Sequence, residues 1–107
     1  MTKDKKLKLR GVIPIIPTPF KTNEDIDFSS LDKLLNFAYS AGAQAVCLPA
    51  YASEFYKLSD KERQELVSAA VKSVNGRIPV LAQVNHTSVK NAIDSAKFAK
   101  QEGADCI

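Results

Sequence analysis

Three times along this chain, a stretch with helical spacing of apolar residues ends at a glycine and runs directly into a short apolar segment. The glycines are Gly42, Gly76 and Gly103, and the apolar segments that follow are 45–48, 78–82 and 104–107. Glycine suits the end of a helix because it adopts a positive φ without steric cost. Parallel strands need helical crossovers between them. The alternation therefore predicts an α/β fold built from βα units of a parallel sheet.

The first predicted strand covers residues 11–20 and is nearly all apolar, as expected for a strand buried on both faces. Prolines at positions 14, 17 and 19 cannot donate hydrogen bonds, so we expect this strand to pair only in part. The other strands are expected at 45–48 and 78–84, with a fourth beginning at 104.

Three helices are expected between these strands, each with an N-cap that the sequence marks. Asp27, Ser59 and Ser88 stand at the cap positions, and Glu62 completes a capping box with Ser59. Each helix carries apolar residues at helical spacing, which predicts one buried stripe per helix. The stripes are Leu31, Leu34, Leu35, Ala38 and Ala41; Leu66, Val67, Ala70, Val71 and Val74; and Val89, Ala92, Ile93, Ala96 and Ala99.

Two architectures begin with this order of elements, the TIM (β/α)₈ barrel and the doubly wound sheet. The glycine-rich signatures of dinucleotide and P-loop sites are absent from the sequence, which disfavours the second. A barrel takes about 250 residues. We therefore expect residues 11–107 to be the N-terminal portion of a barrel, comprising three βα units and the start of strand 4.

Charge and composition restrict the possible partners. The net charge is +3, but residues 1–10 hold five basic groups and one acidic group, which leaves ten basic and eleven acidic groups in residues 11–107. We interpret 1–10 as a solvated basic tail, with neither nucleic acid nor membrane as a partner. The sequence shows no apolar run of membrane-spanning length and no signal-peptide pattern, so we expect a cytoplasmic protein.

The cysteines and acidic residues do not form a recognisable metal site. Cys47 and Cys106 are far apart in sequence, which predicts neither a zinc signature nor a disulfide framework. Both fall in predicted strands, and we interpret them as small core residues in a reducing compartment. No cluster of Asp and His suggests a metal ion, and we expect none.

Several segments resemble, in the same order, the family of dihydrodipicolinate synthase and N-acetylneuraminate lyase. Residues 11–20, ending in Thr-Pro-Phe, are similar to the first strand of that family. Shorter matches follow at 26–28 with Leu31, 41–43, 58–59 before 62–63, 76–80 and 102–105. Together they cover residues 10–107. Their order and spacing make the resemblance specific, although each is weak alone.

The resemblance implies a (β/α)₈ barrel, usually a homotetramer, in which a lysine forms a Schiff base with pyruvate or another 2-oxo acid. The imine serves as the electron sink for making or breaking a carbon–carbon bond, so no organic cofactor is expected. In this family the imine-forming lysine lies on the sixth strand and the main catalytic tyrosine on the fifth. Both would follow residue 107, so this stretch is expected to be inactive alone. The lysines at 57, 61, 72, 90, 97 and 100 are expected on the surface.

The sequence departs from the family after its second strand. There the family carries Gly-Thr-Thr-Gly-Glu, which falls on Ala50-Tyr51-Ala52-Ser53-Glu54, so only Glu54 matches. The resemblance makes Tyr51 the candidate for the proton relay, and makes Tyr51, Ala52 and Ser53 candidates for binding the substrate carboxylate. These changes favour an altered specificity, with a sugar-derived or other 2-oxo acid as the ligand. Alternatively, the loop only packs Tyr51, Phe55 and Tyr56 against the barrel rim.

Other interpretations remain open. His86, the only histidine, follows the third predicted strand and is either an acid–base group or a histidine hydrogen-bonded locally. Glu54 matches a family glutamate that orders the substrate loop. The whole chain could instead be a non-catalytic remnant or a ligand-binding protein on the same scaffold. A standalone small domain is disfavoured because its first and last strands would be open edges, so we expect the isolated chain to associate, aggregate or stay molten.

Overall fold

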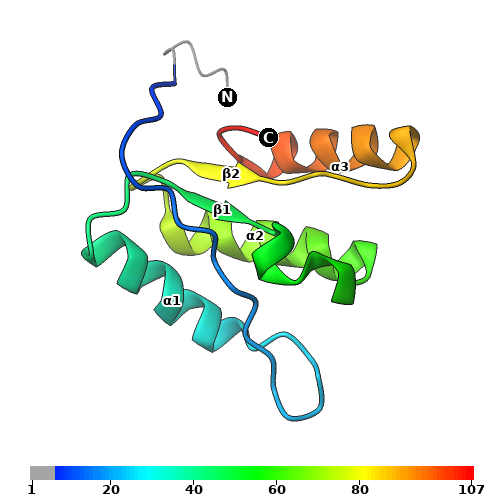
Figure 1. Cartoon of the computed structure of the whole chain (residues 1–107), viewed down its shortest axis with the longest axis horizontal. Coiled ribbons are helices and arrows are strands. Elements are labelled where there is room, and N and C mark those ends of the chain that lie inside the picture. The colour runs from blue at the N-terminus through cyan, green and yellow to red at the C-terminus, as the bar shows by residue number, and fades with distance from the viewer. Residues whose placement is uncertain (1–6) are drawn as a thin grey trace.

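The computed structural model describes residues 7–107, and Figure 1 shows the order of the elements. They are helix α1 (Phe28–Ser40), strand β1 (Val46–Leu48), two single-turn 3₁₀ helices (Tyr51–Ser53 and Phe55–Lys57), helix α2 (Asp60–Val74), strand β2 (Val80–Ala82) and helix α3 (Val89–Glu102). This alternation confirms the predicted α/β class. Of the predicted basic tail, residues 1–6 lie outside the described part, and residues 7–10 are exposed coil.

The strands pair in parallel and in chain order. Cys47 of β1 is opposite Leu81 of β2. Single parallel bridges extend this row on both sides, from Ile15 to Cys47 and from Leu81 to Cys106. Four successive segments of the chain therefore lie side by side. Parallel pairing with helical crossovers confirms the βα units expected from the sequence.

The first segment, residues 11–20, forms less regular structure than a full strand. It runs beside β1, where the Ile16 N–H donates to the Cys47 carbonyl and the Cys47 N–H donates to the Pro14 carbonyl, both at 3.0 Å. Only Ile15 is assigned to a bridge with β1. The prolines lack the N–H groups that a longer ladder would use, which is the partial pairing predicted from the sequence.

The helices begin and end where their capping residues predict. Ser59 and Glu62 form the capping box, with hydrogen bonds of 2.9 and 3.1 Å. The side chains of Asp27 and Ser88 each accept a hydrogen bond from the N–H three residues later, at 3.1 and 3.2 Å. Gly103 ends α3 in the left-handed conformation, with φ of 102°. Side-chain caps of this kind satisfy N–H groups that have no partner inside the helix.

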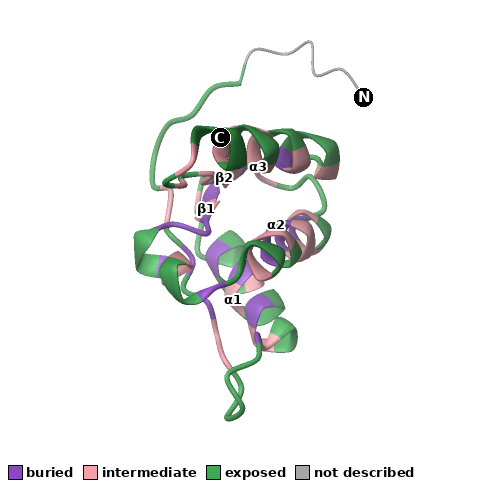
Figure 2. Ribbon diagram, turned by 90° about the vertical axis from the view of Figure 1, so that its right-hand side faces the viewer, coloured by how far each residue is buried: buried purple, intermediate pink, exposed green. Residues whose placement is uncertain are grey.

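The main core lies between the strands and the helices α1 and α2. Leu48 of β1, Leu35 of α1 and Leu66 of α2 are all fully buried in it. Figure 2 shows the buried residues concentrated where these elements face one another. The expected stripes of the first two helices are largely confirmed, with Leu31, Leu35 and Ala38 buried on α1 and Leu66, Val67, Ala70 and Val74 on α2.

The stripe expected on the third helix is wrong in part. Ala99 is buried, but Val89 is 76% exposed and Ile93 is 50% exposed. Helix α2 packs against both α1 and α3, whereas the main helical neighbour of α3 within residues 7–107 is α2. One flank of α3 therefore lacks cover. None of the helices in this described range combines the length and the apolar character needed to cross a membrane.

The opposite face of the sheet is more open than the face that meets the helices. Val46 and Leu48 are fully buried, whereas Cys47 between them is only partly buried and Ile15 beside it is 45% exposed. Alternating side chains of a strand point to opposite faces of its sheet. The expectation that Cys47 and Cys106 are core residues is therefore wrong. Both thiols are free and half-buried in the described structure.

The N-cap of α1 gives a prediction about pH. Hydrogen bonds from the Ser30 N–H and hydroxyl lower the pKa of Asp27 from its ordinary value of 3.8. A depressed pKa means that the carboxylate stabilises the fold above pH 4, and that this contribution is lost as pH falls through the folded pKa. In the complete protein that contains this chain, Asp27→Asn should therefore lower the free energy of unfolding at pH 7, and the difference from the parent should shrink below pH 4 in urea titrations.

The control for this experiment is Asp94→Asn, which removes an exposed carboxylate in the interior of α3. Its effect on stability should lack the pH profile of the Asp27 variant. A difference at position 27 that stays constant from pH 7 to pH 2 would contradict a role for the ionised cap.

Candidate functional site

The candidate site lies where the chain leaves the carboxyl ends of β1 and β2. In parallel α/β sheets this edge collects loops and ligand-binding groups. An open hollow of about 410 Å³ lies here, between the segment after β1, the start of α2 and the segment after β2. Its lining includes Phe55, Tyr56, Asp60, Arg63, Asn85 and His86.

The segment after β1 is a pair of tight turns. Tyr51–Ser53 and Phe55–Lys57 are single 3₁₀ turns, and Glu54 between them has φ of 60°, in the left-handed region. The Tyr51 and Ala52 N–H groups stand at the start of the first turn, where no carbonyl of that turn can accept them. Both residues are exposed. These two residues therefore lie at the surface, and their N–H groups have no partner within their own turn.

Ser53 occupies a different position from its two neighbours. It is fully buried, and its hydroxyl donates to the Ile16 carbonyl at 2.5 Å and accepts from the Ala50 N–H at 3.1 Å. The Thr18 hydroxyl donates to the Ser53 carbonyl at 2.6 Å. These bonds tie the turn after β1 to the first segment of the chain. The predicted contact of Ser53 with a carboxylate is untested, but in this structure its hydroxyl already has two protein partners.

Tyr51, the candidate for the proton relay, is 73% exposed and belongs to a cluster of three aromatic rings. Its ring lies 6.3 Å from that of Phe55, edge to face, and 5.3 Å from that of Tyr56. Phe55 and Tyr56 are themselves 5.8 Å apart. Edge-to-face and tilted pairs at these distances are mutually attractive. The three rings thus pack on one another, and Tyr51 is still accessible to solvent.

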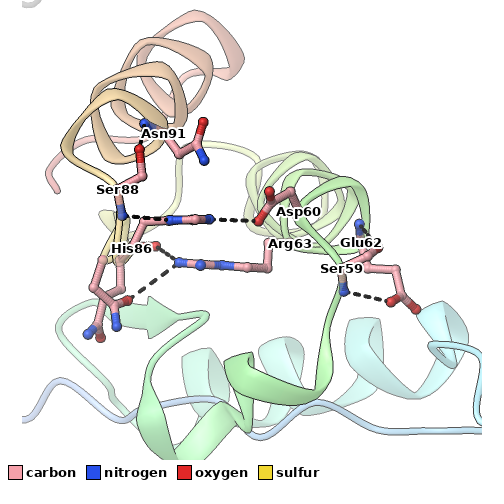
Figure 3. A network of polar contacts seen from close by, with 9 residues as sticks. Ser59, Asp60, Glu62, Arg63, His86, Ser88 and Asn91 are labelled. Carbon is pink, nitrogen blue, oxygen red and sulfur yellow. Dashed lines mark hydrogen bonds and ion pairs between the residues drawn. The ribbon is translucent and has the colours of Figure 1, made fainter.

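Arg63 joins this aromatic cluster to the segment after β2, a connection that the sequence analysis missed. Its guanidinium lies 5.1 Å from the centre of the Phe55 ring. Its Nη2 group donates to the Gln83 carbonyl and to Oδ1 of Asn85, each at 3.4 Å (Figure 3). Burial lowers the pKa of Arg63, and the nearby Asp60 opposes that shift. Arg63 falls in the family match at 62–63, but Gln83 and Asn85 are far along the chain from it, so the sequence does not show what it contacts.

His86 and Asp60 form a second link beside Arg63 (Figure 3). Nδ1 of His86 accepts from the Ser88 N–H at 3.1 Å, and Nε2 lies 3.3 Å from Oδ1 of Asp60. Accepting at Nδ1 requires that this nitrogen carry no proton, so the hydrogen sits on Nε2 and faces the carboxylate. The local interpretation of His86 is confirmed. It connects the first turn of α2 to the start of α3.

The basic and acidic residues around the site are mostly solvated. Glu54 pairs with Lys57 at 3.4 Å, and both side chains are substantially exposed. The six lysines considered as possible nucleophiles are all exposed, as predicted. Imine-forming lysines need a lowered pKa from burial or neighbouring charge.

Within the described residues, no group of three or more metal-ligating side chains comes together.

Cys47 lies on the sheet face away from the helices. Burial raises the pKa of its thiol above the ordinary value of 9.0, and Cys106 adds to that shift. A thiol with a raised pKa is protonated at neutral pH and is a poor nucleophile. The structure therefore gives no support to nucleophilic catalysis by Cys47.

Parallel βα units, with polar and aromatic groups gathered at the carboxyl edge of the strands, define an α/β protein with its functional loops on one side. The match to a known family is equally clear. Residues 8–107 match the sequence profile of the dihydrodipicolinate synthetase family, and the chain belongs to that family. This confirms the resemblance that the sequence indicates.

Relatives with known activities agree with this assignment. The chain is 35% identical over 97 residues to a 4-hydroxy-tetrahydrodipicolinate synthase of Staphylococcus carnosus, covering 91% of this chain and 33% of that protein. It is 31% identical over all 107 residues to an L-2-keto-3-deoxyarabonate dehydratase of Azospirillum brasilense, covering 35% of that protein. The chain thus spans about a third of the length of these relatives.

Solved structures show the same fold. The dihydrodipicolinate synthase of Acinetobacter baumannii, crystallised with pyruvate, superimposes with a TM-score of 0.88 at 30% identity. The superposition covers 92% of this chain and 34% of that one. A high score over nearly all of the present chain means that the α/β arrangement described above is the family arrangement for this part of the fold.

The buried position of Ser53 predicts a structural effect of its removal. Ser53→Ala deletes the hydroxyl that bridges Ile16 and Ala50 and leaves the Ile16 carbonyl without that donor. Loss of a buried hydrogen bond should lower the free energy of unfolding by about 1–3 kcal/mol. Urea denaturation of the complete protein, followed by circular dichroism, would measure it.

The matched control is Ser40→Ala, at an exposed position on the last turn of α1. This change should alter stability by less than about 0.5 kcal/mol. Equal stability of the Ser53 variant and the parent would contradict the anchoring role assigned to the hydroxyl.

Proposed function

We propose that this chain is the N-terminal part of a Schiff-base lyase or aldolase that uses pyruvate or another 2-oxo acid. In this proposal the imine-forming lysine follows residue 107, and the complete protein is a cytoplasmic (β/α)₈ barrel that forms a tetramer or dimer. The family match across residues 8–107 carries the proposal. The accessible turn at Tyr51 and Ala52, on the carboxyl edge of the sheet, supports it.

The proposed chemistry follows from the reactivity of an amine with a ketone. A neutral lysine attacks the carbonyl carbon of the 2-oxo acid, water leaves, and the protonated imine withdraws electrons from the adjacent carbon. A carbon–carbon bond next to that centre can then form or break. Proton transfers accompany the loss of water, and the phenol of Tyr51, which can both donate and accept, is the relay group that we assign in this chain.

The carboxylate of the substrate is assigned to the backbone of the same turn. Successive N–H groups in a turn form a concave anion-binding surface. The Tyr51 and Ala52 N–H groups have the required freedom, because no acceptor within their own turn can reach them. For Ser53 the proposed role is to hold this turn in place, through the hydroxyl that binds Ile16 and Ala50.

A sugar-derived 2-oxo acid is the substrate class that we favour. The loop lacks both threonines of the family motif, so a ligand must be held differently from the synthase substrate. The relative from Azospirillum brasilense, which matches the full chain, is named for a keto-deoxy sugar acid. The same loss of threonines supports the second candidate function, a non-catalytic protein that binds a 2-oxo acid without turning it over.

Trapping the imine tests the proposal directly. The complete natural protein that contains this chain is treated with pyruvate and borohydride and analysed by intact mass. Reduction of a lysine imine should add the mass of one pyruvic acid less one oxygen atom. Proteolysis should place the adduct outside residues 1–107. A sample without pyruvate is the control.

Absence of an adduct, with pyruvate binding retained, would favour the non-catalytic alternative. An adduct on a lysine within residues 1–107 would also contradict the proposal as stated. Turnover of keto-deoxy sugar acids, measured in parallel with turnover of pyruvate and aldehydes, distinguishes the substrate classes.

Removing one oxygen atom tests the relay role of Tyr51. Tyr51→Phe keeps the ring that packs on Phe55 and Tyr56 but deletes the hydroxyl. Loss of a proton-transfer group should lower kcat on the order of a hundredfold. The control is Tyr39→Phe. Tyr39 lies on α1, outside the aromatic cluster of Tyr51, Phe55 and Tyr56, so this change should leave kcat at the parent value. An unchanged kcat for Tyr51→Phe would remove the hydroxyl from the mechanism.

A further inference from the structure

Arg63 contacts two functional loops at once. It extends from the second turn of α2, and its guanidinium lies over the Phe55 ring at 5.1 Å. The same group reaches the Gln83 carbonyl and Oδ1 of Asn85, both beyond the end of β2. The segments that follow β1 and β2 are therefore connected through one side chain. Figure 3 shows the guanidinium lying across the space between α2 and the segment that leads to α3.

The contact with Phe55 continues to Tyr51. The Phe55 ring meets the Tyr51 ring edge to face at 6.3 Å, with an angle of 78° between their planes. Among the described residues, Phe55 and Tyr56 supply the ring contacts of Tyr51, which is otherwise 73% exposed. An exposed side chain with few neighbours depends on those neighbours for its orientation. The position of the Phe55 ring therefore limits where the Tyr51 hydroxyl can lie.

The shape of arginine suits this position. A guanidinium is planar, so one face can cover an aromatic ring while the N–H groups at its edge donate to carbonyl oxygens. An ammonium group lacks this combination of a flat face and a fork of donors. The neighbouring carboxylate, Asp60, pairs with His86, so Arg63 keeps its donors for Gln83 and Asn85.

We propose that Arg63 is a positioning residue that fixes Tyr51 through the ring of Phe55. In this proposal Arg63 acts at one remove, through the ring of Phe55, and has no part in the proton transfer itself. The consequence for turnover rests on the proposed function, because it requires Tyr51 to be the proton relay. The orientation of the Tyr51 ring is independent of that function and can be measured without any substrate.

The first experiment reads the tyrosine rings directly. The complete protein is labelled with 3-fluorotyrosine, and the ¹⁹F signals of Tyr39, Tyr51 and Tyr56 are assigned with Tyr→Phe variants. Arg63→Gln should shift or broaden the Tyr51 and Tyr56 signals and leave Tyr39 unchanged. Arg63→Lys should not restore the parent signals, because it keeps the charge but loses the planar fork.

A matched control comes from the other arginine–aromatic contact in this chain. The guanidinium of Arg77 lies 4.4 Å from the centre of the Tyr39 ring, so Arg77→Gln removes the same kind of contact elsewhere. It should move the Tyr39 signal and leave Tyr51 and Tyr56 in place. If Arg63→Gln prevents folding, Phe55→Leu removes the intermediate ring instead and should produce the same change at Tyr51.

The second experiment measures turnover in the same variants. Misplacing a catalytic group lowers rate more than binding, so Arg63→Gln should reduce kcat on the order of ten- to a hundredfold, with little change in KM for pyruvate. Arg77→Gln should retain the parent kcat. Unshifted Tyr51 signals in Arg63→Gln, or in Arg63→Lys where Arg63→Gln does not fold, would overturn the inference. If the parent forms no imine, the proposed function fails, and the ¹⁹F spectra still decide whether Arg63 holds Tyr51.

Discussion

The parallel register between β1 and β2 determines most of what surrounds it. With Cys47 opposite Leu81, the flanking residues Val46, Leu48 and Val80 point toward the helices. They are buried between the strands and the helices α1 and α2. The same register places the ends of both strands at one edge. The turns that begin at Tyr51 and the segment that includes Asn85 therefore meet above α2, where Arg63 can reach both.

Local signals in the sequence were sufficient to locate the helices. Asp27, Ser59 and Ser88 mark three helix starts because a capping side chain needs only an N–H two or three residues away. Strand lengths were less predictable. Of the strand expected over 78–84, only Val80–Ala82 forms a strand, because the length of a strand depends on partners distant in the sequence. The exposure of Val89 and Ile93 has the same origin, because burial of an apolar stripe requires a neighbouring element to cover it.

The candidate site was predictable in location but not in detail. Alignment with the family motif placed Tyr51, Ala52 and Ser53 in the loop after the second strand, and in the structure these residues form a 3₁₀ turn there. That Ser53 faces inward while Tyr51 faces solvent follows from the geometry of two consecutive 3₁₀ turns, which residue types alone do not specify. Arg63 was missed for a different reason. Its partners Gln83 and Asn85 lie about twenty residues away, and a single arginine on a helix gives no signal of what it contacts.

The left-handed conformation at Glu54 has a consequence for how this loop can change over evolutionary time. The residue with positive φ is Glu54, and not Ser53, which falls on the glycine of the family motif that this segment resembles. The backbone here does not require glycine at position 53, so a serine is accommodated without strain and can use its hydroxyl as an internal tether. The turn can thus keep its path while the side chains at 51 and 52 diverge. Such a loop allows a lineage to explore new ligands by point substitutions, without insertions or a rebuilt scaffold.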